Sequence, residues 1–243
     1  MRLIIIRHGD PDYEHDSLTE KGIKEATLLA ERLKGEKIDR AYVSPLGRAA
    51  LTAKIGLSKT SLTPTTLAWL REFDSTAIHE DQSDVTWDWL PSEWTKDPRF
   101  YSIDTWMEND IFRNSPDLKP LYDERINGLD QLLLENGYQR SGRNYAVVRE
   151  NRDTLVLFCH FGVMCVLLSH LINCSPMVLW HGFVCQPTGV TILSTEEREK
   201  GIASWRISTF GDVSHLTMNG EKPSFAARFR ETYGDGSDER KED

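Results

Sequence analysis

Two uninterrupted apolar runs stand out from an otherwise mixed chain. Residues 3–6 read Leu-Ile-Ile-Ile, and residues 154–159 read Thr-Leu-Val-Leu-Phe-Cys. Short runs of this kind, rich in β-branched residues, are typical of strands buried on both faces of a mostly parallel sheet. We therefore predict two central strands. Each leads directly into polar residues and a glycine, Arg-His-Gly at 7–9 and His-Phe-Gly at 160–162.

Helical periodicity alternates with further strand candidates along the chain. Apolar residues recur at helical spacing from Leu18 to Leu33, and Gly35 ends that pattern. Further helices are expected from Ser44-Pro45 to about residue 55, from residue 115 to Gly137, and over 163–172. Additional strands are expected at 38–43, 60–67, 188–193 and 202–207, the last two joined by a charged turn. This order of elements predicts an α/β fold.

Residues 75–114 differ in texture from the rest. This segment holds Trp87, Trp89, Trp94 and Trp106, four of the seven tryptophans in the chain, together with many acidic residues. We expect a partly helical cap insertion over one end of the sheet. Its aromatic residues either line a substrate cleft or attach the cap to its base, and the sequence leaves both interpretations open.

The remaining stretches carry little apolar pattern. Residues 140–152 are polar and predict an extended loop with part of a helix. Residues 234–243 consist largely of glycine and charged residues, so we expect a disordered acidic tail. Residues 1–233 are expected to form a single domain.

Composition limits the classes of partner. The 243 residues carry a net charge of −9, with 39% hydrophobic and 28% charged residues, as in an ordinary globular protein. A field of that sign repels nucleic acid and anionic membranes, so we expect neither as a partner. An anionic substrate must then be held by a local basic cluster. Nothing in the pattern sets an oligomeric state.

The four cysteines, at 159, 165, 174 and 185, form no pair with metal-binding spacing. Three of them fall in or beside apolar surroundings, which favours buried free thiols and a cytoplasmic location. We expect neither a metal nor a cofactor.

Chemically useful side chains follow several of the predicted strands. His8 and His160 come directly after the two buried strands, Arg48 follows the strand at 38–43, and Glu72 follows the strand at 60–67. Because the carboxyl ends of parallel strands meet at one edge of a sheet, these side chains are expected to converge there.

Five separated motifs together resemble the histidine phosphatase superfamily, also called the phosphoglycerate mutase-like family. They are Arg7-His8-Gly9, Leu18-Thr19-Glu20-Lys21-Gly22, Ser44-Pro45-Leu46-Gly47-Arg48-Ala49 with Thr52-Ala53, Leu70-Arg71-Glu72, and His160 with Gly162 two residues later. The resemblance implies a three-layer α/β/α sandwich around a mostly parallel central sheet. It covers residues 2 to about 172.

The resemblance also implies an activity, a metal-independent phosphomonoesterase that acts on a small phosphorylated molecule. His8 would attack phosphorus to give a phosphohistidine, and Arg7, Arg48 and His160 would bind the phosphoryl oxygens. Glu72 would protonate the leaving oxygen, with Asp74 close by as an alternative acid. Nearby arginines would keep the attacking imidazole unprotonated.

The chain departs from the mutase pattern at two places. The loop after His8 reads Asp-Pro-Asp-Tyr-Glu at 10–14, and Phe-Asp-Ser follows Glu72, where mutases carry other residues. Phe161 also replaces the glycine that commonly follows the second histidine. These differences favour hydrolysis over phosphomutase activity. A non-catalytic phospho-ligand binding protein and a metallohydrolase are the further alternatives.

Overall fold

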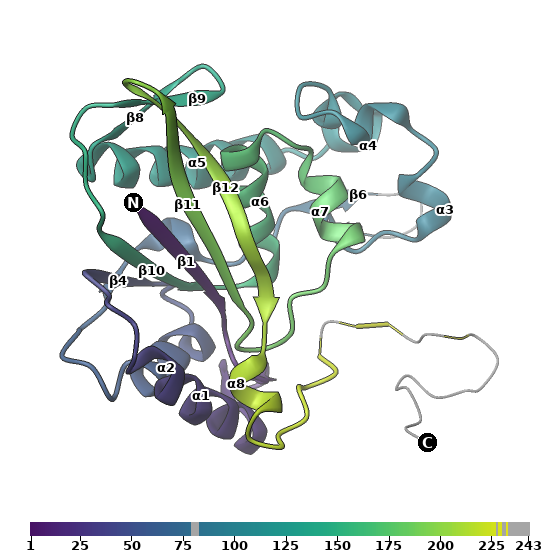
Figure 1. Cartoon of the computed structure of the whole chain (residues 1–243). Coiled ribbons are helices and arrows are strands. Elements are labelled where there is room, and N and C mark those ends of the chain that lie inside the picture. The colour runs from purple at the N-terminus through teal and green to yellow at the C-terminus, as the bar shows by residue number, and fades with distance from the viewer. Residues whose placement is uncertain (79–82, 227, 230–231, 233–243) are drawn as a thin grey trace.

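The computed structural model describes residues 1–78, 83–226, 228–229 and 232. Its core is an eight-stranded sheet, whose central strands are seen in Figure 1. The strand order is β5-β4-β10-β1-β11-β12-β9-β8. Strands β1 (Arg2–Arg7) and β10 (Thr154–Cys159) lie side by side in its middle, as the two apolar runs predict.

The half of the sheet on one side of β1 is parallel. Strand β1 pairs with β10, β10 with β4 (Arg40–Val43), and β4 with β5 (Thr65–Thr66). The strand predicted at 60–67 is therefore only two residues long. Arg7 lies opposite Cys159 in the register of β1 and β10, so His8 and His160 leave the sheet next to one another.

The other half is antiparallel, so the sheet is mixed rather than mostly parallel. It consists of β11 (Val190–Glu199), β12 (Ile202–Asp212), β9 (Asn144–Val147) and β8 (Tyr138–Ser141). The hairpins turn at Gly142 and Gly201, whose φ angles of +59° and +83° are left-handed. The prediction of a loop at 140–152 is thus partly wrong, because much of this segment belongs to the β8–β9 hairpin.

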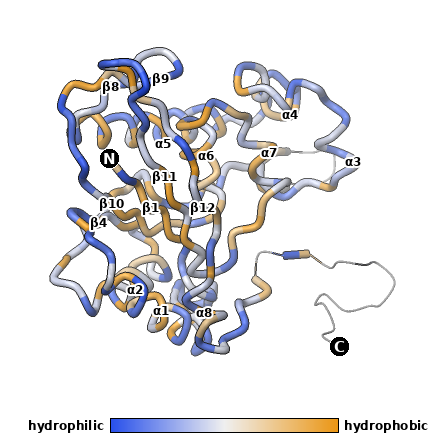
Figure 2. Tube along the Cα trace, viewed as in Figure 1, coloured by the Kyte–Doolittle hydropathy of each residue, from blue (hydrophilic) through white to orange (hydrophobic). Residues whose placement is uncertain are grey.

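Helices cover both faces of the sheet and confirm the three-layer α/β architecture. Ile4 and Ile6 face α1 (Glu20–Leu33) and α2 (Gly47–Gly56), whereas Leu3 and Ile5 belong to the core packed under α5 (Leu118–Glu135) and α6 (Phe161–Ile172). Figure 2 shows the apolar residues concentrated along the central strands. Two-residue strands β2 (Pro11–Asp12) and β3 (Ser17–Leu18) pair beside α1, and a 3₁₀ turn, η1 (Ala68–Leu70), precedes Glu72.

The described part of the 75–114 segment is made of short elements. These are β6 (Thr76–Ile78), β7 (Ser83–Val85), α3 (Pro91–Trp94), η2 (Pro98–Tyr101), η3 (Trp106–Glu108) and α4 (Asp110–Arg113). They lie beside α7 (Pro176–Gly182) at one side of the sheet (Figure 1). The rings of Trp106 and Trp180 meet edge to face at 5.7 Å, which joins this segment to α7.

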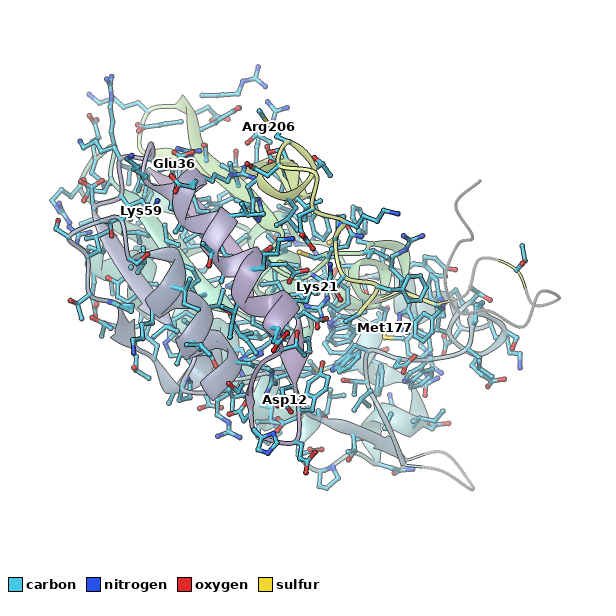
Figure 3. All side chains as sticks on the ribbon, turned by 90° about the horizontal axis from the view of Figure 1, so that it is seen from below. Asp12, Lys21, Glu36, Lys59, Met177 and Arg206 are labelled. Atoms are coloured by element: carbon cyan, nitrogen blue, oxygen red, sulfur yellow. The ribbon has the colours of Figure 1, made fainter. Side chains whose placement is uncertain are left out.

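After α8 (Ser214–Thr217) the chain returns along the start of α1. Lys21 donates to the carbonyl of Lys222 at 2.6 Å and pairs with Glu221, and Figure 3 shows it beside this C-terminal segment. The N–H of Ser224 donates to Glu25 at 3.1 Å, and burial raises the pKa of that carboxyl to about 7. The tail predicted at 234–243 lies outside the described residues. Within the described ranges, every helix is too short or too polar to cross a bilayer.

Candidate active site

His8 follows β1 directly and is 2% exposed. Its Nδ1 lies 2.7 Å from the carbonyl oxygen of Gly9. A carbonyl only accepts hydrogen bonds, so Nδ1 must carry the ring hydrogen when this bond is made. The lone pair of the neutral ring is then on Nε2, which is the atom available for nucleophilic attack.

The pKa of His8 lies well below its ordinary value. Burial is the largest cause because it disfavours the imidazolium cation, and the guanidinium of Arg7 and, more weakly, that of Arg48 act in the same direction. The hydrogen bond to Gly9 opposes them. The sequence argument attributes the neutral ring to the arginines, but in the structure desolvation matters more.

His160 lies beside His8 at the N-terminus of α6. The centroids of the two rings are 5.1 Å apart, and Nε2 of His160 is 2.7 Å from the hydroxyl oxygen of Ser44. That hydroxyl accepts the N–H of Leu46 at 3.3 Å, so its own hydrogen is available to Nε2. We assign the ring hydrogen of His160 to Nδ1 on this basis. Burial, followed by the charge of His8, lowers the pKa of His160 well below its usual range.

The two arginines are held by partners distant in the sequence. Arg7 donates through Nη1 to the carbonyls of Cys185 at 2.7 Å and Ala226 at 3.0 Å. Arg48 donates to Asp16 at 2.7 Å, and its guanidinium lies 5.3 Å from the centre of the Tyr13 ring. Both guanidiniums are thus fixed before any ligand binds.

Three buried N–H groups of this cluster have no hydrogen-bond acceptor within the described part of the chain. They are Nε of Arg7, Nε of Arg48 and Nδ1 of His160. A buried donor without an acceptor is costly, at about 1–3 kcal/mol each. Three of them on neighbouring cationic or imidazole groups point to an anion with several acceptor oxygens as the missing partner.

Glu72 closes the site against α6. Its carboxylate accepts the N–H groups of Phe73 at 2.7 Å, Val163 at 2.8 Å and Gly162 at 3.3 Å, so it caps the N-terminus of the helix. Burial nevertheless raises its pKa above the ordinary value, against these hydrogen bonds.

The position of Gly162, two residues after His160, follows from this contact. A Cβ at Gly162 would lie 2.7 Å from Oε1 of Glu72 and 3.0 Å from the Trp87 ring. A glycine is therefore needed at position 162, where the backbone of α6 contacts the Glu72 carboxylate. Phe161 occupies the first helical position, where a side chain fits.

The predicted site residues converge. Arg7, Arg48 and Glu72 line a single cavity of about 740 Å³, and Asp74 lines it as well. His8 and His160 are buried within electrostatic range of both arginines. We call Arg7, His8, Arg48 and His160 the His–Arg cluster.

Several supporting residues were missed or given another role. A helix was predicted to start at Ser44-Pro45, but α2 begins at Gly47 and Ser44 instead binds His160. Asp16 accepts the N–H of Gly47 at 2.6 Å as well as Arg48. The hydroxyl of Thr52 accepts the N–H of Gly9 at 3.0 Å. In the sequence, Ser44 and Thr52 can be identified only because they belong to a motif. Nothing in the local sequence identifies Asp16.

The described ranges contain no group of three or more histidine, cysteine, aspartate or glutamate side chains arranged to hold a metal ion.

Comparison with known proteins identifies this architecture. Residues 3–108 match the family model of the histidine phosphatase superfamily, branch 1. No curated protein sequence matches the chain.

Several solved structures share the fold. A mutant phosphoserine phosphatase from Entamoeba histolytica in complex with phosphoserine is 19% identical, with a TM-score of 0.59 over 88% of this chain and 98% of that one. The α-ribazole phosphatase of Shigella flexneri is 21% identical, with a TM-score of 0.55 over 88% and 97%. A mycobacterial glucosyl-3-phosphoglycerate phosphatase in complex with VO₃ is 18% identical, with a TM-score of 0.53 over 86% and 98%. The family match over residues 3–108 includes the motifs of β1, α1, α2 and Glu72, and the fold is common to the solved structures, so the chain is similar to the histidine phosphatase superfamily in both respects.

Proposed function

We propose that the protein is a metal-independent phosphomonoesterase that forms a phosphohistidine on His8. The observation that carries this proposal is the group of three unpaired buried N–H donors around the neutral His8 ring. A phosphoryl group has the acceptor oxygens to pair with them and an electrophilic phosphorus for Nε2 to attack. The phosphatase names of the structural neighbours support the same activity.

In the first step, Nε2 of His8 attacks phosphorus as the bond to the ester oxygen breaks. The leaving oxygen takes the proton of Glu72 and departs as an alcohol. Arg7, Arg48 and Nδ1–H of His160 hold the three other oxygens, where negative charge is concentrated. Fixed positive charge and alignment supply most of what phosphoryl transfer requires of a protein.

In the second step, water attacks phosphorus from the side that the alcohol has left. Glu72, now a carboxylate, accepts a proton from this water, and the bond between phosphorus and Nε2 breaks. Inorganic phosphate leaves, and His8 and Glu72 return to their starting protonation states.

The direct test is release of inorganic phosphate from p-nitrophenyl phosphate, with and without a chelator. We expect turnover that a chelator does not reduce. A phosphomutase would instead transfer phosphate between the hydroxyls of a sugar acid with little release. A binding protein would bind phosphate without turnover, and a metallohydrolase would lose activity in the chelator.

The pH profile of kcat/KM tests the assignment of Glu72. His8 must be unprotonated to attack, and burial lowers its pKa, so we expect an acid limb with a midpoint below 6.5. Glu72 must be protonated to act as the acid, and burial raises its pKa, so activity is expected to fall with rising pH at a midpoint above 4.5.

Glu72→Gln should remove the alkaline limb, whereas the neighbouring variant Asp74→Asn should retain it. The substrate's own ionisation is corrected for by measuring both variants on the same aryl phosphate. Loss of the alkaline limb in Asp74→Asn alone would move the acid role to Asp74.

A further inference from the structure

The cavity extends well beyond the His–Arg cluster. It runs from Arg7, Arg48 and Glu72 between the 75–114 segment and α7, and its volume of about 740 Å³ far exceeds what one phosphoryl group fills. Aromatic residues line it, namely Tyr13, Trp87, Trp89, Trp94, Phe161, Trp180, Phe183 and Phe229. We call this space the aromatic cavity.

Several of these rings are fixed by the protein through their polar edges. The indole N–H of Trp87 donates to the carbonyl of Phe73 at 2.8 Å, and that of Trp180 donates to Gly162 at 3.0 Å. Trp94 stacks on His181, with ring centroids 5.1 Å apart and an interplanar angle of 21°. The indole N–H groups of Trp87 and Trp180 are therefore already engaged, and these rings offer a ligand mainly apolar surface.

His181 holds the wall together as a neutral ring. Its Nδ1 donates to the carbonyl of Met177 at 2.8 Å, and its Nε2 accepts the N–H of Trp89 at 3.2 Å. An Nε2 that accepts a hydrogen bond carries no proton, so His181 adds no positive charge to the cavity. It joins α7 to the 75–114 segment at the place where Trp94 stacks.

Apolar side chains stay exposed around the same cavity. Tyr13, Phe183, Val184 and Phe229 are 68%, 44%, 49% and 77% exposed, and all four line it. Exposed apolar groups that gather at a cavity mark a surface that binds apolar matter. They line one continuous cavity with Arg7 and Arg48 of the His–Arg cluster, so the occupant should carry both a phosphoryl group and an apolar body.

The charged residues of the cavity outside the His–Arg cluster also limit which ligands it accepts. Among the described lining residues beyond Arg7, Arg48 and Glu72, Asp74 and Asp88 are acidic and Arg228 is basic. Two negative charges and one positive charge give this part of the lining a net charge of −1. A second phosphate or a carboxylate on the substrate would thus meet a repulsive environment, whereas a neutral or cationic group would not.

Resting on the proposed function, we propose that the substrate class is a phosphate monoester of a flat aromatic alcohol or phenol without a second anionic group. The phosphoryl group would sit in the His–Arg cluster and the aromatic body between the 75–114 segment and α7. Phosphoglycerates and sugar bisphosphates are poor matches for this cavity.

The test compares kcat/KM for phenyl phosphate, 2-naphthyl phosphate, 6-carboxy-2-naphthyl phosphate and glycerol 2-phosphate. We expect the naphthyl ester to exceed the phenyl ester at least tenfold, and the added carboxylate to remove most of that gain. Asp88→Asn should raise kcat/KM for the carboxylated ester severalfold. It should leave kcat/KM for 2-naphthyl phosphate within twofold of wild type.

Trp94→Ala should lower kcat/KM for the naphthyl ester about tenfold, mainly through KM, and change phenyl phosphate little. Met218→Ala is the matched control, because Met218 is 84% exposed on the surface and outside the cavity lining. A preference for glycerol 2-phosphate or the carboxylated ester, or no effect of Trp94→Ala, would overturn the proposed substrate class.

Binding measurements separate this proposal from the proposed hydrolysis. The affinities of 2-naphthylmethylphosphonate and its 6-carboxy analogue, followed by tryptophan fluorescence, do not require turnover. Tighter binding of the phosphonate that lacks the carboxylate, without hydrolysis of any ester, would support the proposed ligand class and refute the proposed phosphatase activity. Hydrolysis of phenyl phosphate with equal binding of the two phosphonates would support the phosphatase activity and refute the proposed ligand class.

Discussion

His8→Ala is expected to abolish phosphate release, with kcat reduced at least about 10⁴-fold, because removal of a covalent nucleophile costs on the order of 10⁶ in kcat in a hydrolase. In the structure Nδ1 of His8 is committed to the carbonyl of Gly9, and burial keeps Nε2 unprotonated. An alanine removes the only group we assign to the attack. The measurement is the steady-state rate on p-nitrophenyl phosphate.

His170→Ala is the control for loss of a histidine as such. His170 pairs with Asp130 at 2.9 Å between α6 and α5, away from the aromatic cavity. We expect this variant to keep a rate near that of wild type, and thermal melting of both variants shows whether either fails to fold. Substantial turnover by folded His8→Ala would remove His8 from the role of nucleophile.

Arg48→Ala is expected to lower kcat/KM by about 10²–10³-fold, equal to roughly 3–4 kcal/mol of transition-state stabilisation, the usual effect of removing one fixed donor to a developing oxyanion. The side chain of Arg48 is already oriented by Asp16, and its Nε has no acceptor among the described residues. Arg48→Lys should recover only part of the loss, because an ammonium lacks the planar fork.

Arg32→Ala provides a matched comparison for Arg48. Arg32 is also a partly buried arginine paired with an aspartate, Asp212, but it does not line the aromatic cavity. We expect a similar effect of both substitutions on melting temperature and a loss of kcat/KM in Arg48→Ala alone. Equal rates in the two variants would exclude Arg48 from the site.

The strongest sequence predictions concern features that are local. The apolar runs of β1 and β10 identify strands buried on both sides, and the residues after them therefore had to emerge at one edge. That reasoning brings His8 and His160 together without coordinates. The same reasoning includes Arg48 and Glu72, which follow two further predicted strands, and the structure places both on the same cavity.

The features that the sequence misses depend on contacts between distant residues. Arg7 is held by the carbonyls of Cys185 and Ala226, which are 178 and 219 residues away and belong to backbone that any residue could supply. Serine is a common helix-capping residue, but the hydroxyl of Ser44 binds His160 because β4 and β10 are neighbours. Local propensity does not encode these pairings.

The β8–β9 hairpin in the antiparallel half of the sheet was also hard to foresee. Strands β8 and β9 are four residues each, and β8, which is mostly polar, forms the outer edge of the sheet. Tyr138 and Tyr145 are their buried residues, and Tyr145 packs edge to face on Trp205 at 6.4 Å. Two buried residues in so short a hairpin give no recognisable alternation.

The central claim is a covalent bond between phosphorus and Nε2 of His8, and rapid acid-free quenching of the enzyme with an aryl phosphate tests it directly. Mass spectrometry of the quenched protein should show one added phosphoryl group on the peptide that contains His8, stable in base, labile in acid and absent from His8→Ala. Turnover without any such adduct, or an adduct on another residue, would contradict the account.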